Sequence, residues 1–156
     1  MTVFGLPAHV LVIHAAVVFT PLAVLCAWAY VGSSRWRSLT RWPTAILALT
    51  AGVSVWAARI TGNSLLHSRP QLGPLVATHR HRGNQLSLIV IAFVVVTLAA
   101  VFMLGGPSML ASGKGARAEA SRPVSLVLAV LVVALGLAVM IWVILTGDAG
   151  ARAIWG

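Results

Sequence analysis

The sequence has few charged side chains and almost no acidic ones. Only 8% of its 156 residues are charged, and eleven Lys/Arg face just two acids, Glu119 and Asp148. A soluble domain carries about 25% charged residues, so this chain cannot cover a water-exposed surface with polar groups. With 60% hydrophobic residues and a mean hydropathy of +0.99, the composition indicates a membrane protein of one compact domain.

Cysteine and the common catalytic motifs are also scarce. Cys26 is the single cysteine, which excludes an intramolecular disulfide, and its apolar surroundings favour a small buried side chain. The sequence contains no G-x-S-x-G, no H-E-x-x-H and no pair of neighbouring carboxylates, so we do not expect a hydrolytic enzyme. The basic residues lie between apolar runs, a pattern that favours a lipid bilayer over nucleic acid as the partner.

Four apolar runs are long enough to cross a bilayer, which needs about 20 residues of helix. They span residues 9–31, 43–60, 86–106 and 123–145. Short connections between them predict an all-α fold, a polytopic up-and-down bundle of four transmembrane helices covering residues 1–156. Pro43 and Pro123 suit the first turn of a helix, whereas Pro21 predicts a kink inside the first one. The first run exceeds a signal-peptide core and has no Lys or Arg before it, so we expect it to remain as a helix.

The distribution of basic residues gives an expected orientation. Six lie in the first and third connections: Arg35, Arg37, Arg41, Lys114, Arg117 and Arg122. The second connection and the C-terminal tail hold up to five, counting Arg59. The positive-inside rule therefore places the first and third connections in the cytoplasm, by a narrow difference, and both termini on the outer face of the cell membrane. Tryptophans near the ends of the runs fit interfacial positions.

An up-and-down bundle would gather the unusual polar residues on the outer face. All five histidines and one of the two acids belong to segments that meet there. The residues expected in this cluster are His9, His14, Arg59, His79, Arg80, His81, Arg82 and Asp148.

The cluster allows several pairings. His14 lies deeper than His9 by about 7.5 Å at 1.5 Å per residue, so we expect His14 to face the bundle interior, as a ligand or bonded to a neighbour, and His9 to be solvated. Arg59 could pair with Asp148. In an extended segment His79 and His81 would share one face and could chelate a metal, whereas a helix would separate them. The alternating arginines suit an anionic group or the lipid headgroups.

Short motifs along nearly the whole chain resemble the domain-of-unknown-function 2231 family of bacterial membrane proteins. They are GLPAHVLVIHAAVVFTPLAVL near the start, RITGNSL, HRHRGNQLSL, and the closing TGDAGARAIWG. Val10 stands where the family commonly has proline. The resemblance implies a four-span membrane domain and supplies no catalytic residues.

Two functions compete on this evidence. The first is an accessory membrane protein that binds a cofactor, haem b or a metal ion, through His14, His79 and His81. The second is a structural or lipid-contacting subunit without a cofactor, working with other membrane subunits or as a homo-oligomer. A transport path is disfavoured because no acid or base lies deeper in the runs than His14.

Overall fold

The computed structural model describes residues 2–3, 6–104 and 121–155, and within them the chain is almost entirely helical. Two short strands, β1 (Thr2–Val3) and β2 (Leu6–Pro7), pair antiparallel before the first helix. The rest forms α1 (Ala8–Gly32), α2 (Ser34–Ser68), the 3-10 turn η1 (Pro70–Leu72), α3 (Ala77–Met103) and α4 (Arg122–Trp155). Neither the strand pair nor η1 was predicted from the sequence.

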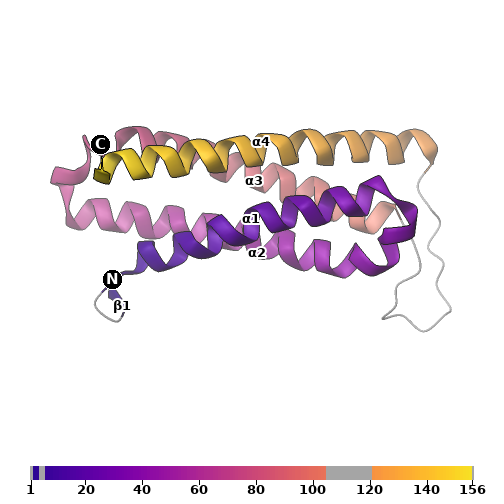
Figure 1. Cartoon of the computed structure of the whole chain (residues 1–156), viewed down its shortest axis with the longest axis horizontal. Helices are drawn as coiled ribbons and strands as arrows, with labels where there is room; N and C mark the ends of the chain where they lie inside the picture. Colours follow the sequence, from indigo (N-terminus) through magenta and orange to yellow (C-terminus); the bar gives the residue numbers. More distant parts are fainter. Residues whose placement is uncertain (1, 4–5, 105–120, 156) are drawn as a thin grey trace.

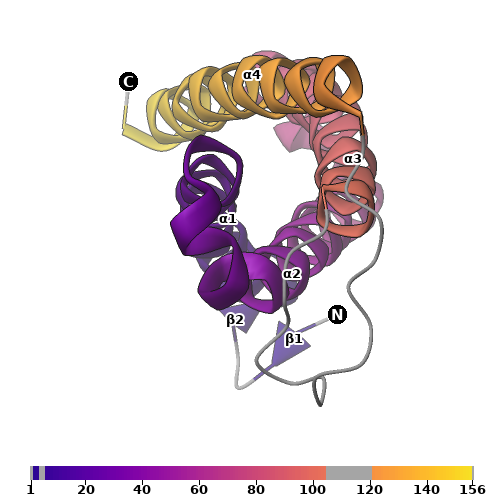
Figure 2. The ribbon, with the colours of Figure 1, turned by 90° about the vertical axis from the view of Figure 1, so that its right-hand side faces the viewer.

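The four long helices pack antiparallel in a ring, which confirms the predicted all-α bundle. Helix α1 packs most extensively along α2, and α3 along α4, while α2–α3 and α4–α1 contacts close the ring. Figure 2, viewed along the bundle, shows this order, with α1 diagonally opposite α3. Figure 1 shows both described ends of the chain at the same end of the bundle, beside the connection from α2 to α3.

All four helices are long and apolar enough to cross a membrane. Their outward faces carry large apolar side chains that water would not favour, such as Val18, Val53, Leu88 and Ile144, each at least 60% exposed. Exposed apolar faces on every side of a bundle are the expected pattern for a protein surrounded by lipid.

Each helix nevertheless buries one narrow stripe. Fully buried Val24, Tyr30, Phe93, Val101 and Val139 fill the centre. Small residues allow the close α1–α2 contact, and the Thr44 hydroxyl there donates to the carbonyl of Cys26. The Tyr30 hydroxyl reaches the carbonyls of Ala100 and Val101 at 3.4 Å, across the diagonal.

The helices extend well beyond the predicted spans. Helix α2 starts at Ser34 and not at Pro43, so the expected connection of residues 32–42 shrinks to a break at Ser33 and the first-turn position of Pro43 is wrong. Proline removes one N–H and so deprives the Leu39 carbonyl of its helical donor. Leu39 is exposed near the helix start, where water or headgroups can supply that bond. Pro123 does lie in the first turn of α4, and α1 runs unbroken through Pro21.

Residues 77–85 also differ from one of the conformations considered from the sequence. They form the first turns of α3 and not an extended loop. His79 and His81 are therefore about 200° apart around one helix, at about 100° per residue, which removes the shared face that a His-x-His chelate needs.

Candidate histidine pair at one end of the bundle

The end of the bundle where α1 and α3 begin and where α2 and α4 finish gathers the polar residues, and we call it the histidine end. All five histidines belong to segments at this end: His9, His14, His67, His79 and His81. The gathering itself agrees with the expectation from sequence. The side chains that face one another inside it differ from the expected set.

His9, at the start of α1, points towards α2. Its Nδ1 lies 3.0 Å from the Ala58 carbonyl oxygen and 3.3 Å from the Thr61 hydroxyl. A carbonyl oxygen only accepts, so this contact requires the proton on Nδ1. In the neutral ring the lone pair then remains on Nε2, the usual metal-binding atom of histidine.

His79, in the first turn of α3, makes the equivalent contact with the neighbouring helix α4. Its Nδ1 lies 2.9 Å from the carbonyl oxygen of Thr146 in α4. The same reasoning places the proton on Nδ1 and the lone pair on Nε2. A backbone acceptor that fixes one ring nitrogen while the other stays available is the arrangement commonly found around metal-binding histidines.

The two rings meet across the diagonal of the bundle. Their centroids are 6.3 Å apart and their planes cross at 75°. Glycines let the other helices approach them closely: a Cβ on Gly62 of α2 would lie 3.1 Å from His9 Cε1, and one on Gly150 of α4 would lie 3.0 Å from His79 Nδ1. Every long helix thus contributes to the site, two through an imidazole and two through a glycine and a backbone carbonyl.

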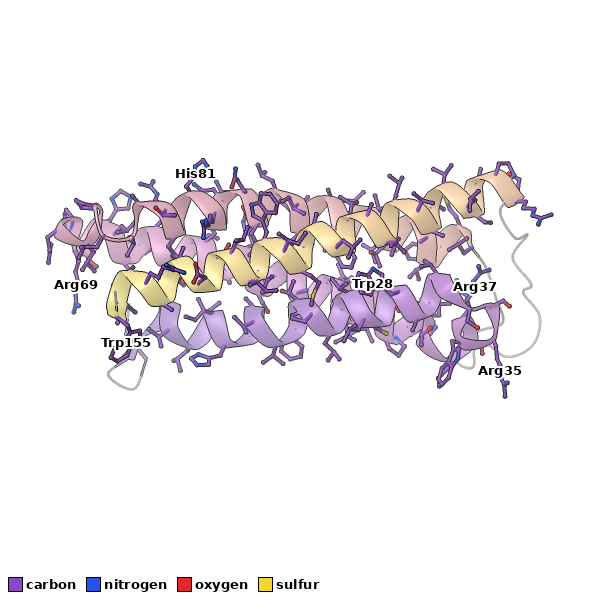
Figure 3. The ribbon with its side chains drawn as sticks, turned by 45° about the horizontal axis from the view of Figure 1, so that its top comes forward. Trp28, Arg35, Arg37, Arg69, His81 and Trp155 are labelled. Carbon is purple, nitrogen blue, oxygen red and sulfur yellow. The ribbon has the colours of Figure 1, made fainter. Side chains whose placement is uncertain are left out.

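His14 and His81 do not join this pair. Both are exposed, and Figure 3 shows His81 pointing away from the bundle. His14 satisfies its Nδ1 on the carbonyl of Val10, 2.6 Å away on its own helix. The expectation that His14 faces the interior and His9 the solvent is therefore wrong, because the rotation of α1 about its axis turns His9 inward and His14 outward.

The charged residues form a network beside the pair that also differs from the expected one. Arg59 donates to the Ser87 hydroxyl at 3.0 Å and lies 4.9 Å over the ring of Trp56. Asp148 instead contacts Arg152, at 2.9 Å, and Arg82, at 3.8 Å. The possible Arg59–Asp148 pair therefore does not form, and Arg82, which competes for the same carboxylate, does contact it. Arg152, one helical turn from Asp148, is the nearer partner.

Two arginines of α3 take different positions in this network. Arg82 also donates to the Leu145 carbonyl at 2.7 Å, whereas Arg80 is exposed. The half-buried guanidinium of Arg82 therefore ties α3 to α4 close to His79.

Thr146 carries a buried polar atom at this end that has no partner within the described part of the chain. The Thr146 hydroxyl is buried, with the residue only 9% exposed, and its Oγ1 makes no hydrogen bond, although the carbonyl of the same residue accepts from His79. A buried hydroxyl without a partner costs about 1–3 kcal/mol, so a water molecule or ligand atom beside it would stabilise the site. No contact with a histidine was predicted from the sequence for Thr146, Gly62 or Gly150, because these contacts depend on how the helices pack.

Residues 2–3, 6–104 and 121–155 contain no group of three or more His, Cys, Asp or Glu side chains suited to a metal ion. Comparisons with protein-family models, with curated proteins and with solved structures give no match.

Proposed function

We propose that the chain is a multi-pass membrane protein that binds one haem, with His9 and His79 as the two axial ligands. The observation that carries the proposal is the pair of imidazoles, each fixed through Nδ1 and each left with a free Nε2, on diagonally opposite helices. His9 replaces His14 and His81 in the ligand set that the sequence suggested.

The number of ligands favours haem over a bare metal ion. Zinc needs three or four protein ligands, and the described residues hold no group of three or more His, Cys, Asp or Glu side chains that could bind it. The iron of haem already has four porphyrin nitrogens and takes its remaining ligands from residues such as histidine. Bundle cores commonly build cofactor sites from side chains on facing helices.

The distance between the two imidazole rings also favours haem. Two imidazoles that bind one metal from opposite sides, at metal–nitrogen distances of about 2.0 Å, have centroids roughly 6 Å apart. The observed separation is 6.3 Å. The porphyrin would have to replace the present edge-on contact between the rings, which α2 and α4 now approach closely at Gly62 and Gly150.

The surrounding charge suits the two carboxylates of haem. Arg59, Arg80 and Arg82 lie at this end, with Asp148 as the one acid among the described residues. Guanidinium groups bind carboxylates through paired, charge-assisted hydrogen bonds. With the termini on the outer face, as the basic residues favour, the haem would lie close to the outer surface of the cell membrane.

The direct experiment is an absorbance spectrum of the protein purified in mild detergent, before and after stoichiometric addition of haem. We expect an intense Soret band at one haem per chain. His14→Ala and His81→Ala should bind haem as the unchanged protein does, because both side chains point away from the pair. Because free haem absorbs in the same region, unbound haem is removed by gel filtration before the second spectrum. Absence of a Soret band from the protein fraction under both conditions would overturn the proposal.

A structural role for the histidines is the second candidate. The contacts of His9 with Ala58 and of His79 with Thr146 join α1 to α2 and α3 to α4, so both rings contribute to helix packing without any ligand. In that case each alanine variant would lose one hydrogen bond and about 1 kcal/mol of unfolding free energy. Added haem would then leave the melting temperature of every variant unchanged.

A further inference from the structure

The opposite end of the bundle has a surface of a different kind, built by the first turns of α2. This helix has 35 residues and is about 52 Å long at 1.5 Å per residue, whereas the hydrocarbon core of a bilayer is about 30 Å thick. The segment before Pro43 carries Arg35, Arg37 and Arg41, so we place this end of the helix beyond the hydrocarbon, at the level of the lipid headgroups.

Within this segment Arg35, Trp36 and Leu39 line an open hollow of about 380 Å³. All three are exposed, Trp36 at 53% and Leu39 at 56%. Arg35 makes no hydrogen bond or ion pair with the described residues, and Figure 3 shows it pointing away from the bundle. The hollow thus joins an unpaired guanidinium to two large apolar side chains.

Among the residues that the structure describes, those with a charge at this end of the bundle are all basic. Arg37, Arg41 and Arg122 lie at the same end, while the one acid in the described ranges, Asp148, belongs to the histidine end. Arg41 lies 5.7 Å from the ring of the neighbouring Trp42, which is 37% exposed. A tryptophan-flanked basic segment at headgroup level attracts anionic lipid.

We infer that the hollow lined by Arg35, Trp36 and Leu39 binds the headgroup of an anionic phospholipid. Arg35 would hold the phosphate through charge-assisted hydrogen bonds, and Trp36 and Leu39 would contact the glycerol and the upper acyl chain. The apolar pair beside the guanidinium is the reason for a lipid rather than a free phosphate ion. The inference does not depend on haem binding at the other end.

The test is native mass spectrometry of the protein with added phosphatidylglycerol, compared with phosphatidylcholine. We expect preferential retention of phosphatidylglycerol, weakened about fivefold by Arg35→Gln, the factor for one surface arginine. Trp36→Ala should also weaken it. Arg69→Gln, which removes an exposed arginine from the histidine end, is the matched control and should leave retention unchanged.

Three results would overturn the inference. They are equal retention of both lipids, equal loss in Arg35→Gln and Arg69→Gln, and competition by millimolar inorganic phosphate, which would indicate an anion site without a lipid contact. The helical circular dichroism of each variant shows whether it folds. Because the substituted side chains are exposed, we do not expect unfolding to cause a selective loss of phosphatidylglycerol.

Discussion

Replacing either His9 or His79 with alanine is expected to abolish haem binding at micromolar concentrations. Changing a residue that merely supports a metal ligand typically lowers metal affinity 10–100-fold, so loss of one axial ligand should lower it by about 100-fold or more. Haem titration followed by the Soret band measures the effect. The double variant should be little worse than either single variant once binding is lost.

Matched substitutions separate this loss from a general effect on the fold. His14→Ala lies on the same helix as His9→Ala, and His81→Ala lies two residues from His79→Ala. Each control removes an imidazole of the same size that is exposed and points away from the pair. Equal loss of haem from a control and from its partner variant would contradict the assignment of the ligand pair.

The second large effect is expected at Gly136, in the middle of α4. A Cβ at this position would lie 2.6 Å from Nε1 of Trp28 and 3.0 Å from Cγ1 of Val24, both on α1. Real Cβ atoms do not approach so closely, so Gly136→Ala must push the indole or the helix aside. Overpacking of this kind costs roughly 1–3 kcal/mol of unfolding free energy.

Gly147→Ala is the control for that variant. It makes the same substitution on the same helix, but no atom lies within 4 Å of the added methyl group. The difference in helix propensity between glycine and alanine, about 1 kcal/mol, applies to both. Thermal denaturation in detergent should therefore show Gly136→Ala as the less stable variant by roughly 1–3 kcal/mol. Equal stability of the two would mean that α1 and α4 do not pack through Trp28 and Gly136.

The sequence was sufficient for the number of helices and for the end of the bundle where the polar residues gather. Both follow from apolar runs about 20 residues long joined by short connections, which leave an up-and-down arrangement as the simple solution. Helix boundaries were less predictable. The arginine-rich start of α2 is polar, yet helical, because a helix that continues past the hydrocarbon core still satisfies its own backbone.

The rotation of each helix could not be predicted, and it decides the site. In a soluble protein the polar face shows the rotation, but α1 is apolar all round, so its sequence does not mark an inner side. The buried stripe of α1 passes through Thr20, and His9 lies 11 residues earlier, about three full turns, on the same side. His14 is six residues from Thr20, about 120° away, and so faces outward. The position of each histidine around the helix axis, and not its depth in the membrane, therefore decides which one faces the bundle interior.

The same rule separates the two histidines of α3. His79 precedes buried Val90 by 11 residues and shares its side of the helix, whereas His81 falls almost opposite. Gly62 and Gly150 then allow α2 and α4 to close on the two inward rings. Gly62 and Gly150 are far along the chain from His9 and His79, so their contacts with the two rings could be predicted only once the inward side of each helix was known.

The electron paramagnetic resonance spectrum of the ferric, haem-loaded protein tests the central claim most directly, because it reports the number of strong axial ligands on the iron. Two histidine ligands predict a low-spin signal in the unchanged protein. Any haem retained by His9→Ala or His79→Ala should be high-spin, and His14→Ala and His81→Ala should stay low-spin. A high-spin signal from the unchanged protein, or a low-spin signal that survives the loss of His9 or His79, would contradict the account.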